Sequence, residues 1–138
     1  MESEPLFVEV VSATKRVWEG DAVSVIARTT EGDVGVLANH SPFLAAIVPC
    51  AAEVLTADGK REVVALDEGF ISVADNRVSL IGQYASLARE ISLDEARREL
   101  AVAEKRLNEG NIDPATYQHF NRATAQVRAA TRFAELGH

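Results

Sequence analysis

The chain lacks the features of a secreted or membrane-spanning protein. Its single cysteine, Cys50, excludes a disulfide within the chain and is typical of a reducing compartment. Its apolar runs are far shorter than the roughly 20 residues that cross a bilayer as a helix, and its acidic, polar start does not resemble a secretion signal. We therefore expect a soluble intracellular protein with no direct membrane insertion.

Positive charge is also scarce. The 138 residues carry 14 Lys and Arg against 21 Asp and Glu, a net charge of −7. Because phosphates repel such a surface, the chain as a whole is not expected to bind nucleic acid or anionic lipid nonspecifically. The length suits one compact domain, or a small domain with an appendage.

Catalytic motifs are missing as well. The sequence has no Gly-rich phosphate loop, no Gly-x-Ser-x-Gly and no His-Glu-x-x-His. No group of Cys, His and carboxylate residues has the spacing of metal ligands, so His40 is expected to be a turn or interface residue. Cys50 follows Pro49 in an apolar stretch, which predicts a buried small side chain rather than a nucleophile. The sequence predicts a protein that is not an enzyme and has no metal site.

The first part of the chain contains a series of short apolar runs. They lie between residue 6 and about residue 84, are rich in β-branched residues and are separated by turn residues. Asp58-Gly59 and Asp75-Asn76 indicate hairpins, and residues 34–49 are typical of a short strand, a tight loop and a second strand. So many closely spaced short strands predict an all-β sandwich or barrel.

At Ser92 the hydrophobic period changes from that of a strand to that of a helix. Ser92 and Glu95 form a capping box, and Gly110 ends the predicted helix. Asp113 as N-cap and Pro114 at the first helical position begin a second helix, so we expect an antiparallel helical hairpin. The expected apolar seams are Leu93, Ala96, Leu100, Ala103 and Leu107 on the first helix and Thr116, Phe120, Ala123, Val127, Ala130 and Ala134 on the second.

The second helix is rich in alanine and basic. Because alanine buries little apolar area, we expect the hairpin to close weakly and to be able to detach. Residues 114–138 hold Arg122, Arg128 and Arg132 against Glu135, a charge of +2 that leaves −9 for the rest of the chain. These arginines suit an acidic partner surface or a phosphate, or they form the solvated face of an amphipathic helix.

Five segments together resemble the epsilon subunit of the bacterial, proton-translocating F-type ATP synthase. The resemblance covers nearly the whole chain and depends on the order and spacing of the segments rather than on one motif. The segments are Val10-Val11-Ser12-Ala13, Glu31-Gly32-Asp33-Val34-Gly35-Val36, His40-Ser41-Pro42-Phe43-Leu44, Glu68-Gly69-Phe70-Ile71-Ser72-Val73 with Val78-Ser79-Leu80-Ile81, and Leu93-Asp94-Glu95-Ala96-Arg97.

The resemblance implies a fold and a place in a complex. The expected fold is an N-terminal β-sandwich of about ten strands over residues 1–88, followed by a regulatory helical hairpin over residues 89–138. The expected role is that of a non-catalytic rotor subunit, monomeric within the complex, which contacts the gamma subunit, the c-ring and the alpha/beta catalytic head. Such a subunit would lie at the cytoplasmic face of the membrane as a peripheral protein, and its hairpin would restrain ATP hydrolysis.

The resemblance also implies site residues. Glu31, Gly32 and Asp33 would meet the rotor ring, and His40, Ser41 and Pro42 would lie on the neighbouring rotor-facing loop. The nucleotide-binding residues of some family members correspond to Leu93, Asp94, Arg97, Arg128 and Arg132, and contacts with the catalytic head to Arg122, Arg128 and Arg132.

Two positions depart from the nucleotide motif. Arg98 stands where the motif has alanine, and Glu104 replaces a basic residue farther along the first helix. We therefore expect no cofactor and only weak ATP binding. Two other interpretations of the sequence are a free-standing ATP-sensing module that uses the same residues and a β-sandwich adaptor with a coiled-coil tail.

Overall fold

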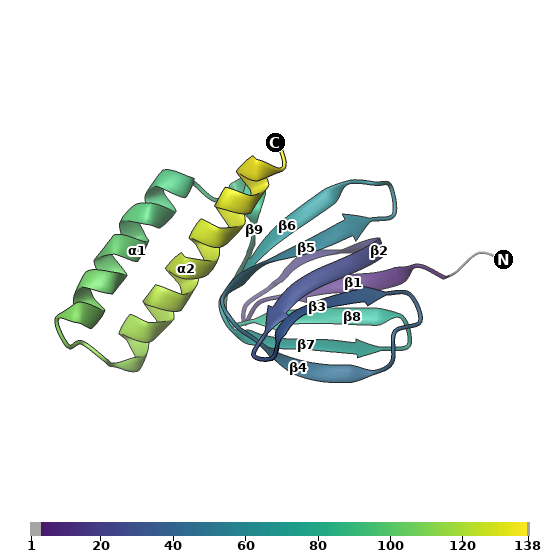
Figure 1. The fold of residues 1–138 in the computed structure, drawn as a ribbon, viewed down its shortest axis with the longest axis horizontal. Helices are drawn as coiled ribbons and strands as arrows, with labels where there is room; N and C mark the ends of the chain where they lie inside the picture. The colour runs from purple at the N-terminus through teal and green to yellow at the C-terminus, as the bar shows by residue number, and fades with distance from the viewer. Residues whose placement is uncertain (1–3, 138) are drawn as a thin grey trace.

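A computed structural model describes residues 4–137 as a β-sandwich followed by two antiparallel helices (Figure 1). This confirms the predicted fold class. The strands are β1 (Leu6–Val11), β2 (Arg16–Thr29), β3 (Gly32–Leu37), β4 (Phe43–Ile47), β5 (Cys50–Thr56), β6 (Arg61–Leu66), β7 (Gly69–Ala74), β8 (Arg77–Gly82) and β9 (Ala85–Leu87). They are followed by a short 3-10 helix, η1 (Ala88–Glu90), and by α1 (Leu93–Asn108) and α2 (Pro114–Glu135).

The strands form one hydrogen-bonded network folded into two layers. One layer runs in the order β1-β8-β7-β4, and the other contains β3, β2, β5, β6 and β9 (Figure 1). All pairings are antiparallel except that of β1 with β8. The two layers meet in an aliphatic core whose largest fully buried side chains include Leu6, Leu66, Ile71 and Leu80.

The described residues contain nine strands rather than about ten, because β2 is unusually long. Its first half pairs with β1, and its second half pairs with β3 and β5. A register shift between Ala22 and Ser24 separates the two halves, and such a bulge bends a strand and increases its twist. One strand of 14 residues therefore contributes to both layers.

The turns form where their residues favour them. Asp75 and Asn76 both adopt a positive φ, as the two-residue turn between β7 and β8 requires. Gly59 has a φ of 86° in the turn between β5 and β6. Both predicted hairpins are confirmed.

Both helices begin at the predicted residues, and the first ends where Gly110 predicts. The Ser92 hydroxyl accepts a hydrogen bond from the Glu95 amide over 3.3 Å at the start of α1, and Gly110 follows the helix with a φ of 91°. The Asp113 carboxylate accepts a hydrogen bond from the Thr116 amide over 3.0 Å, with Pro114 at the first position of α2. These contacts satisfy backbone groups that a helix end leaves open.

The α2 helix has two buried faces, although one seam was expected. Ala123 and Ala130 lie on the predicted seam, whereas the predicted Ala134 is exposed. A second pair, Ala125 and Ala129, packs with Val63, Ala65 and Ala88 of the sandwich and η1. Because α2 covers its outer face, β6 is buried on both sides from Val63 to Leu66.

Candidate functional site

The turn between β2 and β3 presents the first group of predicted partner-binding residues, Glu31, Gly32 and Asp33. The Thr29 hydroxyl fixes this turn, since it donates to the Gly32 carbonyl over 2.8 Å and accepts from the Glu31 amide over 3.1 Å. Gly32 has a φ of 112°, which only glycine adopts readily. The turn is exposed, so its side chains are open to a partner.

Asp33 is paired within the chain. The Arg28 Nε donates to its Oδ1 over 2.9 Å. This hydrogen bond and the positive charge of Arg28 hold the pKa of the Asp33 carboxyl below its usual range. Both side chains are more than half exposed, so the pair orients the carboxylate but adds little stability.

The second group, His40, Ser41 and Pro42, lies at the other end of β3. The Asn39 amide donates to the Asn76 Oδ1 over 2.6 Å, which ties this loop to the turn between β7 and β8. The His40 amide donates to the Leu37 carbonyl over 3.2 Å, which closes a turn, and the His40 ring stands 5.1 Å from the Phe43 ring. Residues 34–39, most of them in β3, separate the two groups, and Figure 1 shows the two ends of β3 at opposite ends of the sandwich. They are two surfaces, not one.

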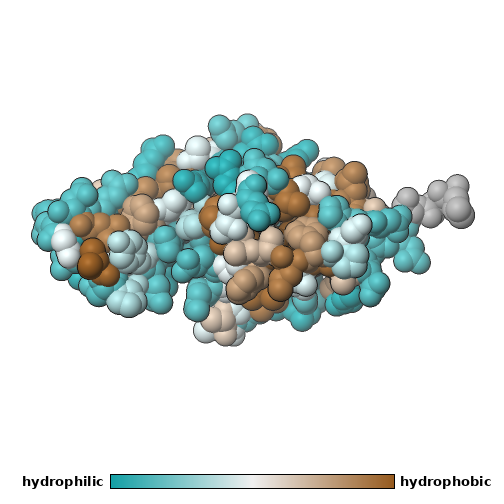
Figure 2. Space-filling model, turned by 60° about the horizontal axis from the view of Figure 1, so that its bottom comes forward, coloured by the Kyte–Doolittle hydropathy of each residue, from teal (hydrophilic) through white to brown (hydrophobic). Residues whose placement is uncertain are grey.

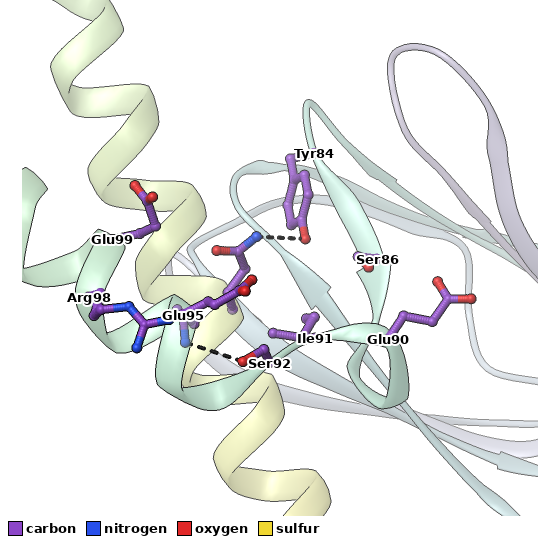
Figure 3. Close-up of a pocket in the computed structure, with 10 residues that line it drawn as sticks. Tyr84, Ser86, Glu90, Ile91, Ser92, Glu95, Arg98 and Glu99 are labelled. Atoms are coloured by element: carbon purple, nitrogen blue, oxygen red, sulfur yellow. Dashed lines mark hydrogen bonds between the residues drawn. The ribbon is translucent and has the colours of Figure 1, made fainter.

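The predicted nucleotide-binding residues divide into two places. Leu93, Asp94 and Arg97 lie on the first turns of α1, where Asp94 and Arg97 are exposed. A hollow of about 430 Å³ opens beside these turns, and Arg98 lines it together with Tyr84, Ser92 and Gln126 (Figure 3). Its other charged residues are Glu90, Glu95 and Glu99. A hollow with three carboxylates and one guanidinium repels a triphosphate.

The arginines of α2 contact the sandwich instead. The Arg128 Nη1 donates to the Pro49 carbonyl over 2.5 Å. Arg132 binds Glu53 with two nitrogens, Nε at 2.9 Å and Nη2 at 3.1 Å. The Glu53 carboxylate raises the pKa of Arg132 above its already high usual value. Arg128 and Arg132 line a second hollow, of about 360 Å³, between α2 and strands β2 and β5.

A nucleotide therefore does not fit the residues that the resemblance implies for it. Leu93, Asp94 and Arg97 line neither hollow, whereas Arg128 and Arg132 line the second and already have partners in the sandwich. Arg122, the third arginine, lies over the Tyr84 ring at 5.3 Å.

The outer face of the β1-β8-β7-β4 layer carries a cluster that the sequence prediction missed. Leu44, Phe70 and Ile81 are 70%, 52% and 43% exposed. Phe70 pairs directly with Ala46 and Ile81, and Ile81 with Val11, so these side chains share one face. We call Val11, Leu44, Ala46, Phe70 and Ile81 the apolar face; Figure 2 shows hydrophobic side chains gathered on this side of the sandwich. The signal was a set of apolar residues at outward positions of neighbouring strands, which share this face with the polar Glu9, Ser72 and Ser79.

The α2 helix packs on β5, β6 and η1, and so leaves the apolar face uncovered. An exposed cluster of large apolar side chains on a soluble protein is a candidate binding surface. Within residues 4–137 no helix is long and apolar enough to cross a membrane.

The fold and its open surfaces define a β-sandwich of the class found in ATP synthase delta and epsilon chains. The model of the family "ATP synthase, Delta/Epsilon chain, beta-sandwich domain" matches residues 5–88. The ATP synthase epsilon chain of Cutibacterium acnes is 48% identical, with 94% of each chain covered. That of Streptomyces coelicolor is 39% identical, with 91% of this chain and 94% of the relative covered. The chain belongs to the ATP synthase epsilon chain family.

Solved structures support the same fold. A chain of the Euglena gracilis mitochondrial ATP synthase, in a structure of OSCP, F1 and c-ring, has a TM-score of 0.72 at 19% identity and covers 97% of this chain and 89% of its own. A chain of the Tetrahymena thermophila central stalk and c-ring has a TM-score of 0.55 at 15% identity, covering 96% and 98%. At these identities the likeness concerns the fold alone.

Proposed function

We propose that the chain is a central-stalk, or rotor, subunit of an F-type ATP synthase, and that it couples proton flow through the membrane ring to ATP synthesis. Membership of the epsilon chain family supports this role. In this proposal the chain is non-catalytic and peripheral at the cytoplasmic face of the membrane. Its partners are the gamma subunit, the c-ring and the catalytic head.

The uncovered apolar face is the observation that carries the proposal. It lies on paired strands, and its largest side chains are an aromatic ring and two branched aliphatic chains. A static, well-packed interface excludes water from such residues and is stabilised by their burial. We assign this face to the gamma subunit, since a subunit that turns with the rotor needs a permanent contact.

The two polar surfaces belong to other contacts. The turn with Glu31, Gly32 and Asp33 offers a charged, rigid edge for the polar loops of the ring. His40, Ser41 and Pro42 lie at the far end of β3 and would meet a different part of the rotor. The hairpin would restrain ATP hydrolysis, with Arg122, Arg128 and Arg132 on acidic surfaces of the catalytic head; this requires that they leave their present partners in the sandwich.

An epsilon-depleted synthase tests the proposal. Wild type is expected to bind the depleted complex, whereas Phe70→Ser removes the centre of the apolar face and should weaken binding by tenfold or more, about the effect of losing one interface anchor. Val102→Ser is the matched control, because Val102 is similarly exposed, at 50%, but lies on α1. Equal binding by all three chains would contradict the assignment of this face.

ATP hydrolysis by the same depleted complex tests the hairpin. The full chain and a chain that ends before Ser92 should both bind, and only the full chain should slow hydrolysis. Binding by both without any slowing would remove the inhibitory role and keep the rotor role. Failure of both to bind would overturn the proposal.

A further inference from the structure

The surface of α2 that meets the sandwich combines small apolar residues with long polar ones. Ala125 and Ala129 form its apolar part, against Val63 and Ala65. Phe133 and Leu136 pack beside them and are partly buried, but the fully buried contacts of α2 in this cluster are made by alanine, which buries little apolar area. The position of the hairpin therefore depends on the polar contacts at the margin of this surface as well as on its apolar packing.

These polar contacts reach two parts of the sandwich. Near Tyr84, the Gln126 Nε2 donates to the Tyr84 hydroxyl over 2.9 Å (Figure 3), and Arg122 lies over the ring. Near β5, Arg128 donates to the Pro49 carbonyl, and Arg132 binds the Glu53 carboxylate. Of these, the contact with Glu53 joins two charged groups by two hydrogen bonds, which is the strongest type.

Glu53 is placed to receive a cation. Its side chain is 13% exposed, so its carboxylate has lost most of its hydration and depends on partners. Arg132 approaches through Nε and Nη2, while Arg61 on β6 stands at 3.6 Å. Arg61 belongs to the sandwich and remains beside Glu53 when the hairpin detaches. Glu53 therefore has a neighbouring cation whether the hairpin is docked or detached. The pair can therefore open without leaving an isolated buried charge.

The surroundings of the hairpin do not favour a nucleotide as the group that holds it. The hollow beside the start of α1 is lined by three glutamates and one arginine, and the arginines expected to bind phosphate are already bound to the sandwich. A nucleotide would have to break these contacts to use these arginines.

We infer that Glu53 is the residue that holds the hairpin against the sandwich, through its ion pair with Arg132, and that this ion pair takes the place of a bound nucleotide. The inference concerns contacts within the chain and does not rest on the proposed function. It makes hairpin docking sensitive to salt and to the charge of residue 53, and insensitive to ATP.

Hydrogen exchange of the isolated full chain, followed by mass spectrometry over peptides of α2, tests the inference. Glu53→Gln and Arg132→Gln should each speed exchange about fivefold, as expected when an ion pair is lost, and the double variant should show no further increase. Added NaCl at 0.5 M should speed exchange in wild type but not in Glu53→Gln. ATP with Mg²⁺ at 1 mM should leave exchange in wild type unchanged.

Glu9→Gln is the matched control. Glu9 is 21% exposed and pairs with Arg16 at 3.3 Å, but it lies on β1, away from the hairpin. This variant should match wild type. Unchanged exchange in both Glu53→Gln and Arg132→Gln, additive effects in the double variant, or slowing by ATP would each overturn the inference. Arg132→Gln alters a partly exposed helix position outside the sandwich, so it still tests the inference if Glu53→Gln destabilises the sandwich.

Discussion

At the scale of single residues, Gly69 shows how closely the strands approach in one corner of the sandwich. It faces Gly82 across the β7–β8 pair, and a Cβ on Gly69 would overlap the backbone carbonyl of Ile81. Backbone cannot move aside as a flexible side chain can, so Gly69→Ala should lower the free energy of unfolding by about 3 kcal/mol.

Urea unfolding measures the effect of this change. Gly35→Ala is the control, because a Cβ there meets nothing within 4 Å. Its midpoint should stay close to that of wild type. If both variants unfolded at the same urea concentration, the close approach at Gly69 would not be a constraint on the fold.

Asp113 gives the molecule a defined dependence on pH. The Thr116 amide and hydroxyl both donate to its carboxylate, and they hold the pKa of Asp113 below its usual value. A lowered pKa in the folded state means that the stabilisation is present above the unfolded pKa of about 4 and is lost as the pH falls through the folded pKa. The start of α2 should therefore fray below about pH 4.

Circular dichroism between pH 6 and pH 2 tests this expectation. Asp113→Asn keeps an N-cap side chain that does not titrate. Its helical signal should change less over this range than that of wild type. An identical acid loss in the two chains would show that Asp113 does not control it.

The helix ends and turns were predicted correctly because they depend on local contacts. Ser92, Gly110, Asp113 and the Asp75-Asn76 turn act on backbone groups within four residues, so the sequence alone specifies them. The partner of Arg132 lies 79 residues away. The sequence around a helical arginine is the same whether its partner is water, a phosphate or Glu53. Only the folded structure identifies the partner.

At the scale of the elements, α2 depends on small side chains. A larger residue at Ala129 would press against Val63 and Ala65 and lift the helix from β6. Ala129→Leu should destabilise the docked hairpin by about 1–3 kcal/mol, the usual effect of overpacking. Faster hydrogen exchange in α2 would show this, with the sandwich core unchanged.

Ala134→Leu is the control for this prediction. Ala134 lies on the same helix but is exposed, so a leucine there should not affect docking. Equal exchange in the two variants would contradict the proposed tight packing between α2 and β6.

The same helix marks the limit of pattern-based prediction. Its spacing predicted one seam, yet α2 is buried on two sides, and alanine occupies both. Alanine is small enough to occur on both buried and exposed faces of a helix. Its position in the sequence therefore does not indicate which face is buried. The short strand β9 was also missed, since its three residues are too few to show a period.

At the scale of the whole molecule, the sandwich has its own core. None of the residues in the main core cluster belongs to the hairpin. A chain that ends before Ser92 should therefore remain folded, with a cooperative thermal transition at a lower temperature because Val63, Ala65 and Ala88 become exposed.

Calorimetry and binding of an apolar dye together test this expectation. The truncated chain should bind more dye than the full chain while it stays folded. Loss of the cooperative transition would show that the hairpin is required for the sandwich to form.

The parallel pairing of β1 with β8 constrains how the chain reaches this fold. β1 is synthesised first, yet Phe7 pairs with Arg77, about seventy residues farther along. Until β8 has left the ribosome, one edge of β1 stays open and can pair with other chains. Closure over such a distance is slow, since much chain must be ordered before the contact forms. The sandwich therefore closes late in synthesis, and the hairpin, made last, docks onto a sheet that has already formed.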